Sequence, residues 1–217
     1  MRVGAADVST VYLTPVRLSY YRGVAQAITN AESALRRAVV QIATEKPISG
    51  VNVSEVCRRA DITRDSFYRF ASSPAALLAM CLYDDHDTDL VTPSHQATGP
   101  RVRALTPATR VLLEHVQRNR QIYRNALTPR LPMELREALL RRLESVLYAH
   151  AREFPEKLPD IQGRRPNEEA VSALVQHASN GVVGAIEFLV ATDGVEDIEH
   201  AIAVLHAATA PWWLAYD

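Results

Sequence analysis

The sequence of this 217-residue chain predicts an all-α protein. Apolar residues recur at spacings of three and four along most of the chain, which is the period of an α-helix with one buried face. Asn, Ser or Thr stands directly before several of these stretches, as helix-capping residues do. No pair of alternating stretches suggests a β-hairpin. We therefore expect helices joined by loops.

The first strong helical pattern runs from Ala31 to Ile42. Its apolar residues fall on one helix face, and a weaker pattern begins near Leu18. Residues 1–17 are therefore expected to form a flexible arm. Lys46-Pro47 ends the helix, because proline cannot continue the hydrogen-bond ladder.

Two short helices are expected next, followed by a longer one. Asn52 caps a helix of about two turns that begins at Val53, and Asp61-Ile62 forms a tight turn after it. Thr63 then caps a helix expected to run from Arg64 to Phe70. Ser73-Pro74, a capping serine with proline in the first turn, starts the longer helix, which fades at the acidic residues 84–87.

The remaining chain predicts more helices and two loops. Residues 92–107 and 155–166 are rich in Pro, Gly or Thr and are expected to be loops. The helical patterns cover residues 107–116, 121–127, 133–154, 171–189 and 198–212.

Composition and charge narrow the class of protein. The formal net charge is −1, but residues 1–70 carry +4 and residues 71–217 carry −5. This distribution suggests that the first third of the chain binds a polyanion. No stretch is expected to span a bilayer, and no apolar run like that of a signal peptide follows Met1. Cys57 and Cys81 form no redox or metal spacing. We expect a cytoplasmic protein with reduced, buried thiols and no membrane partner.

Enzyme and metal signatures are weak. The sequence has no HExxH motif, nucleophile elbow, phosphate loop or glycine-rich cofactor loop. The acidic cluster of Asp84, Asp85, His86, Asp87 and Asp89 favours a solvated helix end over a cation site, because neighbours on a helix point different ways. We expect no catalytic residues, no metal and no cofactor. A catalytic ligand-binding bundle is the minor alternative.

Residues 53–70 predict a helix-turn-helix, in which two short helices flank a tight turn. The second helix of such a motif lies in the DNA major groove and presents its first residues to base edges. Phe67 is the expected inward anchor, while Arg58 and Arg59 raise the local positive potential. Judged by periodicity alone, three packed helices with arginines on their surface and no DNA-binding role are as good an interpretation as a DNA-binding motif. The expected DNA-facing residues are Asn52, Val53, Thr63, Arg64, Asp65, Ser66, Tyr68, Arg69 and Ser73.

These residues carry a resemblance to a known family. The segment 52–70, with its surroundings over about residues 30–80, resembles the signature of the TetR (tetracycline-repressor) family of transcriptional regulators. The residues that match the pattern are Ala60, Ile62, Thr63, Ser66, Phe67, Tyr68, Leu77 and Leu78. Three positions depart from this signature. Asp61 stands where the signature has the turn glycine, Ala71 stands where it has an aromatic residue, and Pro74 stands where it has a lysine that contacts a DNA phosphate.

The resemblance implies a DNA-binding domain over 18–75 and a helical ligand-binding and dimerisation domain over 76–217. It implies a homodimer formed by the last two helices, where the small residues of 180–185 and Pro211-Trp212-Trp213 suit an interface. It also implies a near-palindromic operator, with repression relieved by a small molecule. A cytoplasmic helical interaction module without DNA binding is the alternative. The expected contacts of an apolar or aromatic effector are Leu112, His115, Tyr123, Leu147, Tyr148, His150, Gln176 and His177.

Overall fold

The structure is a computed structural model that describes residues 15–83 and 105–209. Its described residues form helices and connecting turns with no strand, apart from an isolated bridge between Ile161 and Arg164. The predicted all-α class is therefore confirmed. The acidic residues 84–89, the segment 92–104 and the expected interface residues Pro211-Trp212-Trp213 lie outside the described residues.

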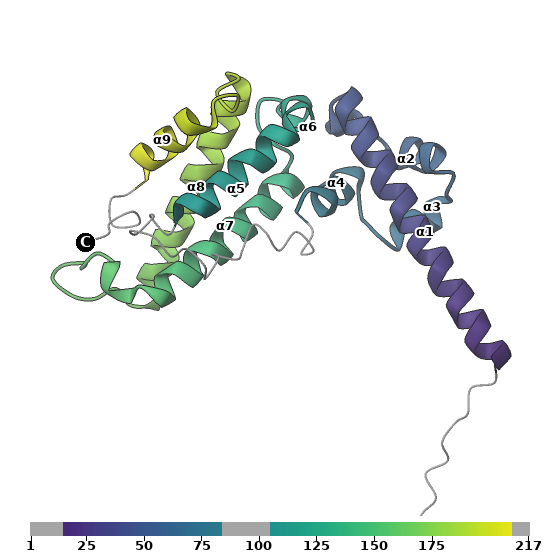
Figure 1. The fold of residues 1–217 in the computed structure, drawn as a ribbon, viewed down its shortest axis with the longest axis horizontal. Coiled ribbons are helices and arrows are strands. Elements are labelled where there is room, and N and C mark those ends of the chain that lie inside the picture. Colours follow the sequence, from purple (N-terminus) through teal and green to yellow (C-terminus); the bar gives the residue numbers. More distant parts are fainter. Residues whose placement is uncertain (1–14, 84–104, 210–217) are drawn as a thin grey trace, which may run out of the picture.

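The helices of the N-terminal part follow the expected order (Figure 1). They are α1 (Pro15–Glu45), the 3-10 turn η1 (Ile48–Gly50), α2 (Val53–Ala60), α3 (Arg64–Tyr68) and α4 (Pro74–Tyr83). Two boundaries differ from expectation. The first helix already includes residues 15–17, which were expected to belong to the arm, and α3 ends at Tyr68 instead of Phe70. The amides of Phe70 and Ala71 both donate to the Phe67 carbonyl, which closes a tight turn.

The helices from Leu105 onward form a second group (Figure 1). They are α5 (Leu105–Arg118), α6 (Arg120–Ala126), α7 (Met133–Glu153), the turn η3 (Pro155–Lys157), α8 (Glu168–Ala191) and α9 (Ile198–Ala208). The loop expected to reach residue 107 ends earlier, because α5 starts at Leu105. The loop expected over 155–166 carries one short 3-10 turn.

One apolar core joins the two groups. It extends from Leu35 and Ile42 on α1, through Leu77 on α4, to Ile186 on α8 and Leu205 on α9. Helix α4 packs against both α1 and α7. The side-chain amide of Asn125 on α6 also donates to two carbonyl groups at the end of α1, at 2.9 and 3.0 Å. Helix α4 therefore contacts helices of both groups.

Helix α8 corrects one expectation from the sequence. It has 24 residues, and an 18-residue window reaches a mean hydropathy of 1.2, which is long and apolar enough to cross a membrane. In the structure α8 packs against α6, α7 and α9. Its buried Glu187 forms ion pairs with Arg130 and Arg136. Within this chain 39% of that window is buried, and the buried face carries the paired carboxylate.

Candidate nucleic-acid interface and effector cavity

Helix α2 is fixed at both ends by the residues expected to do so. The side chain of Asn52 accepts a hydrogen bond of 3.0 Å from the amide of Glu55. Asp61 ends the helix in the left-handed conformation, with φ 55° and ψ 49°. Asp adopts this conformation more readily than most residues, so it serves where the resembled signature has glycine.

Helix α3 is oriented by one cap and one anchor. The Thr63 hydroxyl oxygen accepts from the amide of Ser66, and Phe67 is fully buried in the core. Burial of Phe67 turns Arg64, Asp65 and Tyr68 to the surface, where Tyr68 is 59% exposed. The helix therefore presents polar and aromatic side chains to the surface, from Arg64 at its first residue to Tyr68 at its last.

The two arginines of this face are held by neighbouring hydroxyl groups. Arg69 donates to the Ser66 hydroxyl at 2.9 Å, and Arg64 donates to the hydroxyl of Ser54 on α2. Both arginines are exposed. A guanidinium group has five N–H donors, so a single neutral contact leaves donors for a phosphate or a guanine edge.

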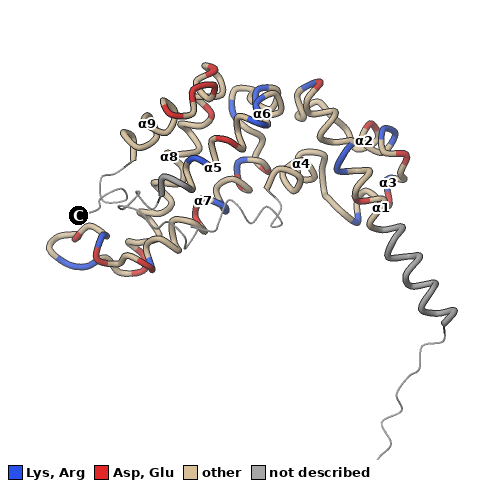
Figure 2. The backbone as a smooth tube through the Cα atoms, viewed as in Figure 1, with Lys and Arg blue, Asp and Glu red and all other residues tan. Residues whose placement is uncertain are grey.

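Ion pairs tie α2 to the end of α1. Arg59 contacts both carboxylate oxygens of Glu45, at 2.5 and 2.8 Å, and Lys46 pairs with Glu55 at 2.8 Å. The Arg59 guanidinium lowers the pKa of the Glu45 carboxyl group below its usual value. Figure 2 shows acidic and basic residues close together around α2 and α3. The charge of Arg59 is therefore largely balanced, and the expectation that it adds positive potential is corrected.

Ser73 has a different environment from the other expected DNA-facing residues. Its hydroxyl oxygen accepts from the Ala76 amide at 3.0 Å, which is the predicted cap. The same hydroxyl group lies 3.0 Å from an oxygen of Glu134 on α7, to which it donates. A carboxylate beside this helix start repels a phosphate, and Ser73 is half-buried. Ser73 thus links α4 to α7.

A cavity of about 70 Å³ lies among α4, α5, α7, α8 and α9. Two of the eight residues expected to contact an effector, Leu112 and Leu147, line it. The polar residues at its wall are Tyr83, Thr109, Arg142, His206 and Thr209. None of these five was expected from the sequence.

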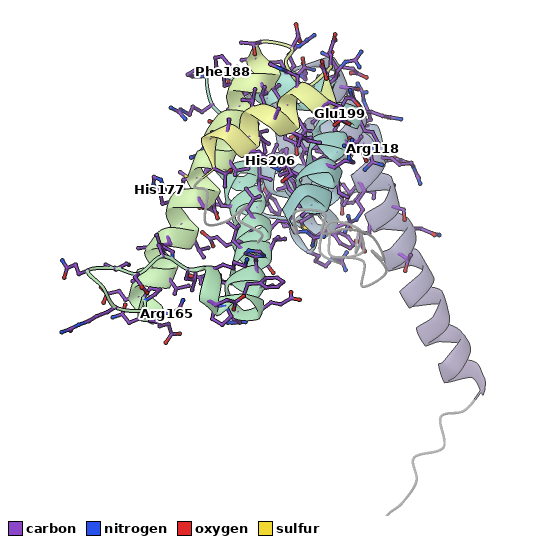
Figure 3. All side chains as sticks on the ribbon, turned by 60° about the vertical axis from the view of Figure 1, so that its left-hand side comes forward. Arg118, Arg165, His177, Phe188, Glu199 and His206 are labelled. Carbon is purple, nitrogen blue, oxygen red and sulfur yellow. The ribbon has the colours of Figure 1, made fainter. Side chains whose placement is uncertain are left out.

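The other six expected effector contacts lie elsewhere. Their helices are correctly identified, but a helix periodicity does not show which part of an inward face borders a cavity. His115 and Tyr123 are buried in the core, Tyr148 is hydrogen-bonded to Ser172, and His150 packs on Phe154. Gln176 and His177 are exposed on α8, where Figure 3 shows His177 on the outer side with Phe188.

A buried polar cluster adjoins the cavity at the end of α4. The hydroxyl groups of Tyr83 and Tyr123 are hydrogen-bonded to each other. The ring of His115 lies 5.6 Å from that of Tyr83 and 6.1 Å from that of Tyr123. Burial raises the pKa of both tyrosines, which keeps their hydroxyl groups protonated. Tyr83 also borders the cavity, so the end of α4 forms part of the cavity wall.

No group of three or more potential metal ligands comes together in the part of the chain that the structure describes. Cys57 is buried and Cys81 half-buried, and they form no disulfide bond with each other. Burial raises the pKa of the Cys57 thiol, so this group stays protonated.

Comparisons with known proteins show a fold and no family. No family model and no curated protein matches the chain. Its structure is similar to that of the "Dihydroxyacetone kinase operon activator DhaS", with a TM-score of 0.52 and 13% sequence identity. The match covers 82% of this chain and 96% of the other. At this identity the likeness shows a shared helical fold.

Proposed function

We propose that this protein is a dimeric, ligand-responsive transcription regulator that binds DNA through α3. The observation that carries the proposal is the capped, anchored helix α3, which turns Arg64, Tyr68 and Arg69 outward together. In a helix-turn-helix these positions meet base edges and phosphates. The other proposed contacts are Asn52, Val53, Thr63, Asp65 and Ser66.

Two further findings support regulation of transcription. The segment 52–70 resembles the TetR signature, and the fold is similar to that of a protein named as an operon activator. The family resemblance favours repression relieved by a small molecule in the cytoplasm. A promoter-reporter assay with and without the protein distinguishes repression from activation.

The proposed dimer forms through the outer face of α8 together with α9. The exposed residues at helical spacing on α8 are Ala173, His177, Asn180, Gly181, Phe188 and Ala191. A Cβ atom added at Gly181 or Gly184 meets no other atom within 4 Å, so packing within one chain does not require these glycines. Glycine destabilises a helix interior by about 1 kcal/mol relative to alanine. Close approach of a helix from a second subunit would explain why glycine stands at these two positions.

Helix α4 is the proposed link between ligand and DNA. Its first turn is tied to α7 by Ser73 and Glu134, and its last residue, Tyr83, borders the cavity. A ligand that displaces Tyr83 shifts α4, which packs on α1 beside α2 and α3. The two α3 helices of a dimer then leave the spacing of about 34 Å that adjacent major grooves require. The ligand acts only if it binds the two states unequally.

Fluorescence anisotropy with mixed-sequence duplexes tests the DNA-binding part of this proposal. We expect DNA affinity to decrease steeply as the salt concentration rises. In a plot of log affinity against log salt concentration, the negative slope of R64A/R69A should be smaller in magnitude by about two than that of the unmodified protein. The matched control is R152A/R165A, which removes two exposed arginines outside α2 and α3, one in the last turn of α7 and one between η3 and α8. Equal binding by both double variants would contradict the assignment of α3. Absence of binding at low salt would favour a helical interaction module.

A further inference from the structure

The cavity combines an apolar wall with basic and hydroxyl groups. Its apolar lining comes from four helices and includes Leu112, Leu139, Leu143, Val146, Leu147 and Leu205. Arg142 from α7 and His206 from α9 reach the same wall. The Nε atom of Arg142 and the Nε2 atom of His206 are buried. A ligand here meets hydrocarbon over most of its surface and nitrogen donors at a few points.

The charge of the lining favours an anion. The described residues that line the cavity include an arginine and a histidine but no aspartate or glutamate. Arginine stays protonated in proteins, and its planar group matches the two oxygens of a carboxylate. A phosphate dianion is more strongly hydrated, so its transfer to this apolar wall costs more than that of a monoanion.

We propose that the cavity binds an amphipathic carboxylic acid, whose hydrocarbon part packs on the leucines of α5 and α7 and whose carboxylate is bound by Arg142 and His206. This assignment deepens the proposed function by giving the chemical class of its effector. The cavity of about 70 Å³ is about half the size of one that holds benzene. Longer acids therefore separate α7 from α4 and α9, and press on Tyr83.

Isothermal titration calorimetry on the full chain without DNA tests the proposal. The probes are linear carboxylic acids of four to ten carbons, each beside the primary alcohol and the primary amine of equal length. We expect each acid to bind at least tenfold more tightly than its alcohol and amine. Affinity should rise about fourfold with each added methylene until the chain outgrows the apolar volume.

Two variants assign the carboxylate preference to α7. In Arg142→Met the acid-to-alcohol ratio should fall below threefold, whereas in Arg152→Met, which removes an exposed arginine of the same helix, it should stay as in the unmodified protein. The comparison of acids with alcohols uses the unmodified protein, so it tests the proposal even if Arg142→Met does not fold. Equal or tighter binding of alcohols or amines, no binding of any acid, or an unchanged ratio in Arg142→Met would overturn the proposal.

Anisotropy with DNA separates this inference from the proposed function. Acids that bind in the calorimeter support the inference whether or not they release DNA. If they bind and DNA affinity stays the same, the ligand class stands and the effector role is wrong. If the protein binds DNA but no acid, the ligand class is wrong and the DNA-binding proposal stands.

Discussion

The hydroxyl group of Tyr83, the last residue of α4, is hydrogen-bonded to that of Tyr123 on α6, and both rings are buried. Tyr83 lines the cavity, and α6, which carries Tyr123, packs against α1. Each hydroxyl group satisfies the other in an apolar surrounding, where an unsatisfied polar group is costly. The pair therefore holds α4 in one position relative to α6.

Removal of both hydroxyl groups should destabilise the fold by less than the sum of the two single removals. Tyr83→Phe or Tyr123→Phe leaves a buried hydroxyl group without its partner, at a cost of about 1–3 kcal/mol in the free energy of unfolding. Urea denaturation of the four proteins measures this cycle, and additive losses would show that the two hydroxyl groups do not interact.

Glu187 should stabilise the connection between α7 and α8. Its carboxylate, 7% exposed, accepts from Arg130, Arg136 and the amide of Leu131. Glu187→Ala leaves the half-buried Arg136 and the buried amide of Leu131 without this acceptor and should lower the free energy of unfolding by about 2 kcal/mol. Chemical denaturation measures the loss.

Glu137→Ala is the control for this change. Glu137 lies on α7, 3.9 Å from Arg141, and both side chains are exposed. An exposed pair contributes less than about 1 kcal/mol. Similar losses in the two variants would mean that burial of Glu187 has no special effect.

His150 should make the fold sensitive to mild acid. Burial lowers its pKa below the ordinary value of 6.5. The unfolded chain therefore binds a proton at His150 more readily than the folded chain, and stability falls as the pH drops below 6.5 toward the lowered pKa. Urea midpoints at pH 7.5 and 5.5 should differ less in His150→Gln than in the unmodified protein. An equal difference would rule out His150 as the responsible group.

A large side chain at Gly184 should prevent the proposed dimer. Gly184→Arg places a long cation on the outer face of α8, where one chain alone has room for it. We expect sedimentation equilibrium to show monomers with a circular dichroism spectrum like that of the unmodified protein. Gly50→Arg is the control, because a Cβ atom at Gly50 also meets nothing within 4 Å. A dimeric Gly184→Arg would place the interface elsewhere.

Local signals in the sequence predict much of the fold. Asn52, Thr63 and Ser73 each precede the helix that they cap, so the caps are recognisable without tertiary contacts. The left-handed Asp61 was also expected from the turn. These features depend on neighbours within four residues, which a sequence shows directly.

The cavity depends on how distant helices pack and was predicted poorly. Of the effector contacts expected on these helices, Leu112 and Leu147 line the cavity, whereas Gln176 and His177 lie at the surface of α8. Arg142 was missed because a charged residue between Leu139 and Leu143 is ordinarily read as solvent-facing. The one sequence signal for it was its position inside an apolar stripe.

Selection of binding sites from fragmented source DNA with the purified protein tests most directly whether α3 reads a DNA sequence. We predict recovery of a near-palindrome whose half-sites are about one helical turn apart. The R64A/R69A protein should fail to enrich it, and R152A/R165A should enrich it as the unmodified protein does. If the folded, dimeric protein enriches no sequence at low salt, or if R64A/R69A recovers the same site, α3 is not a recognition helix.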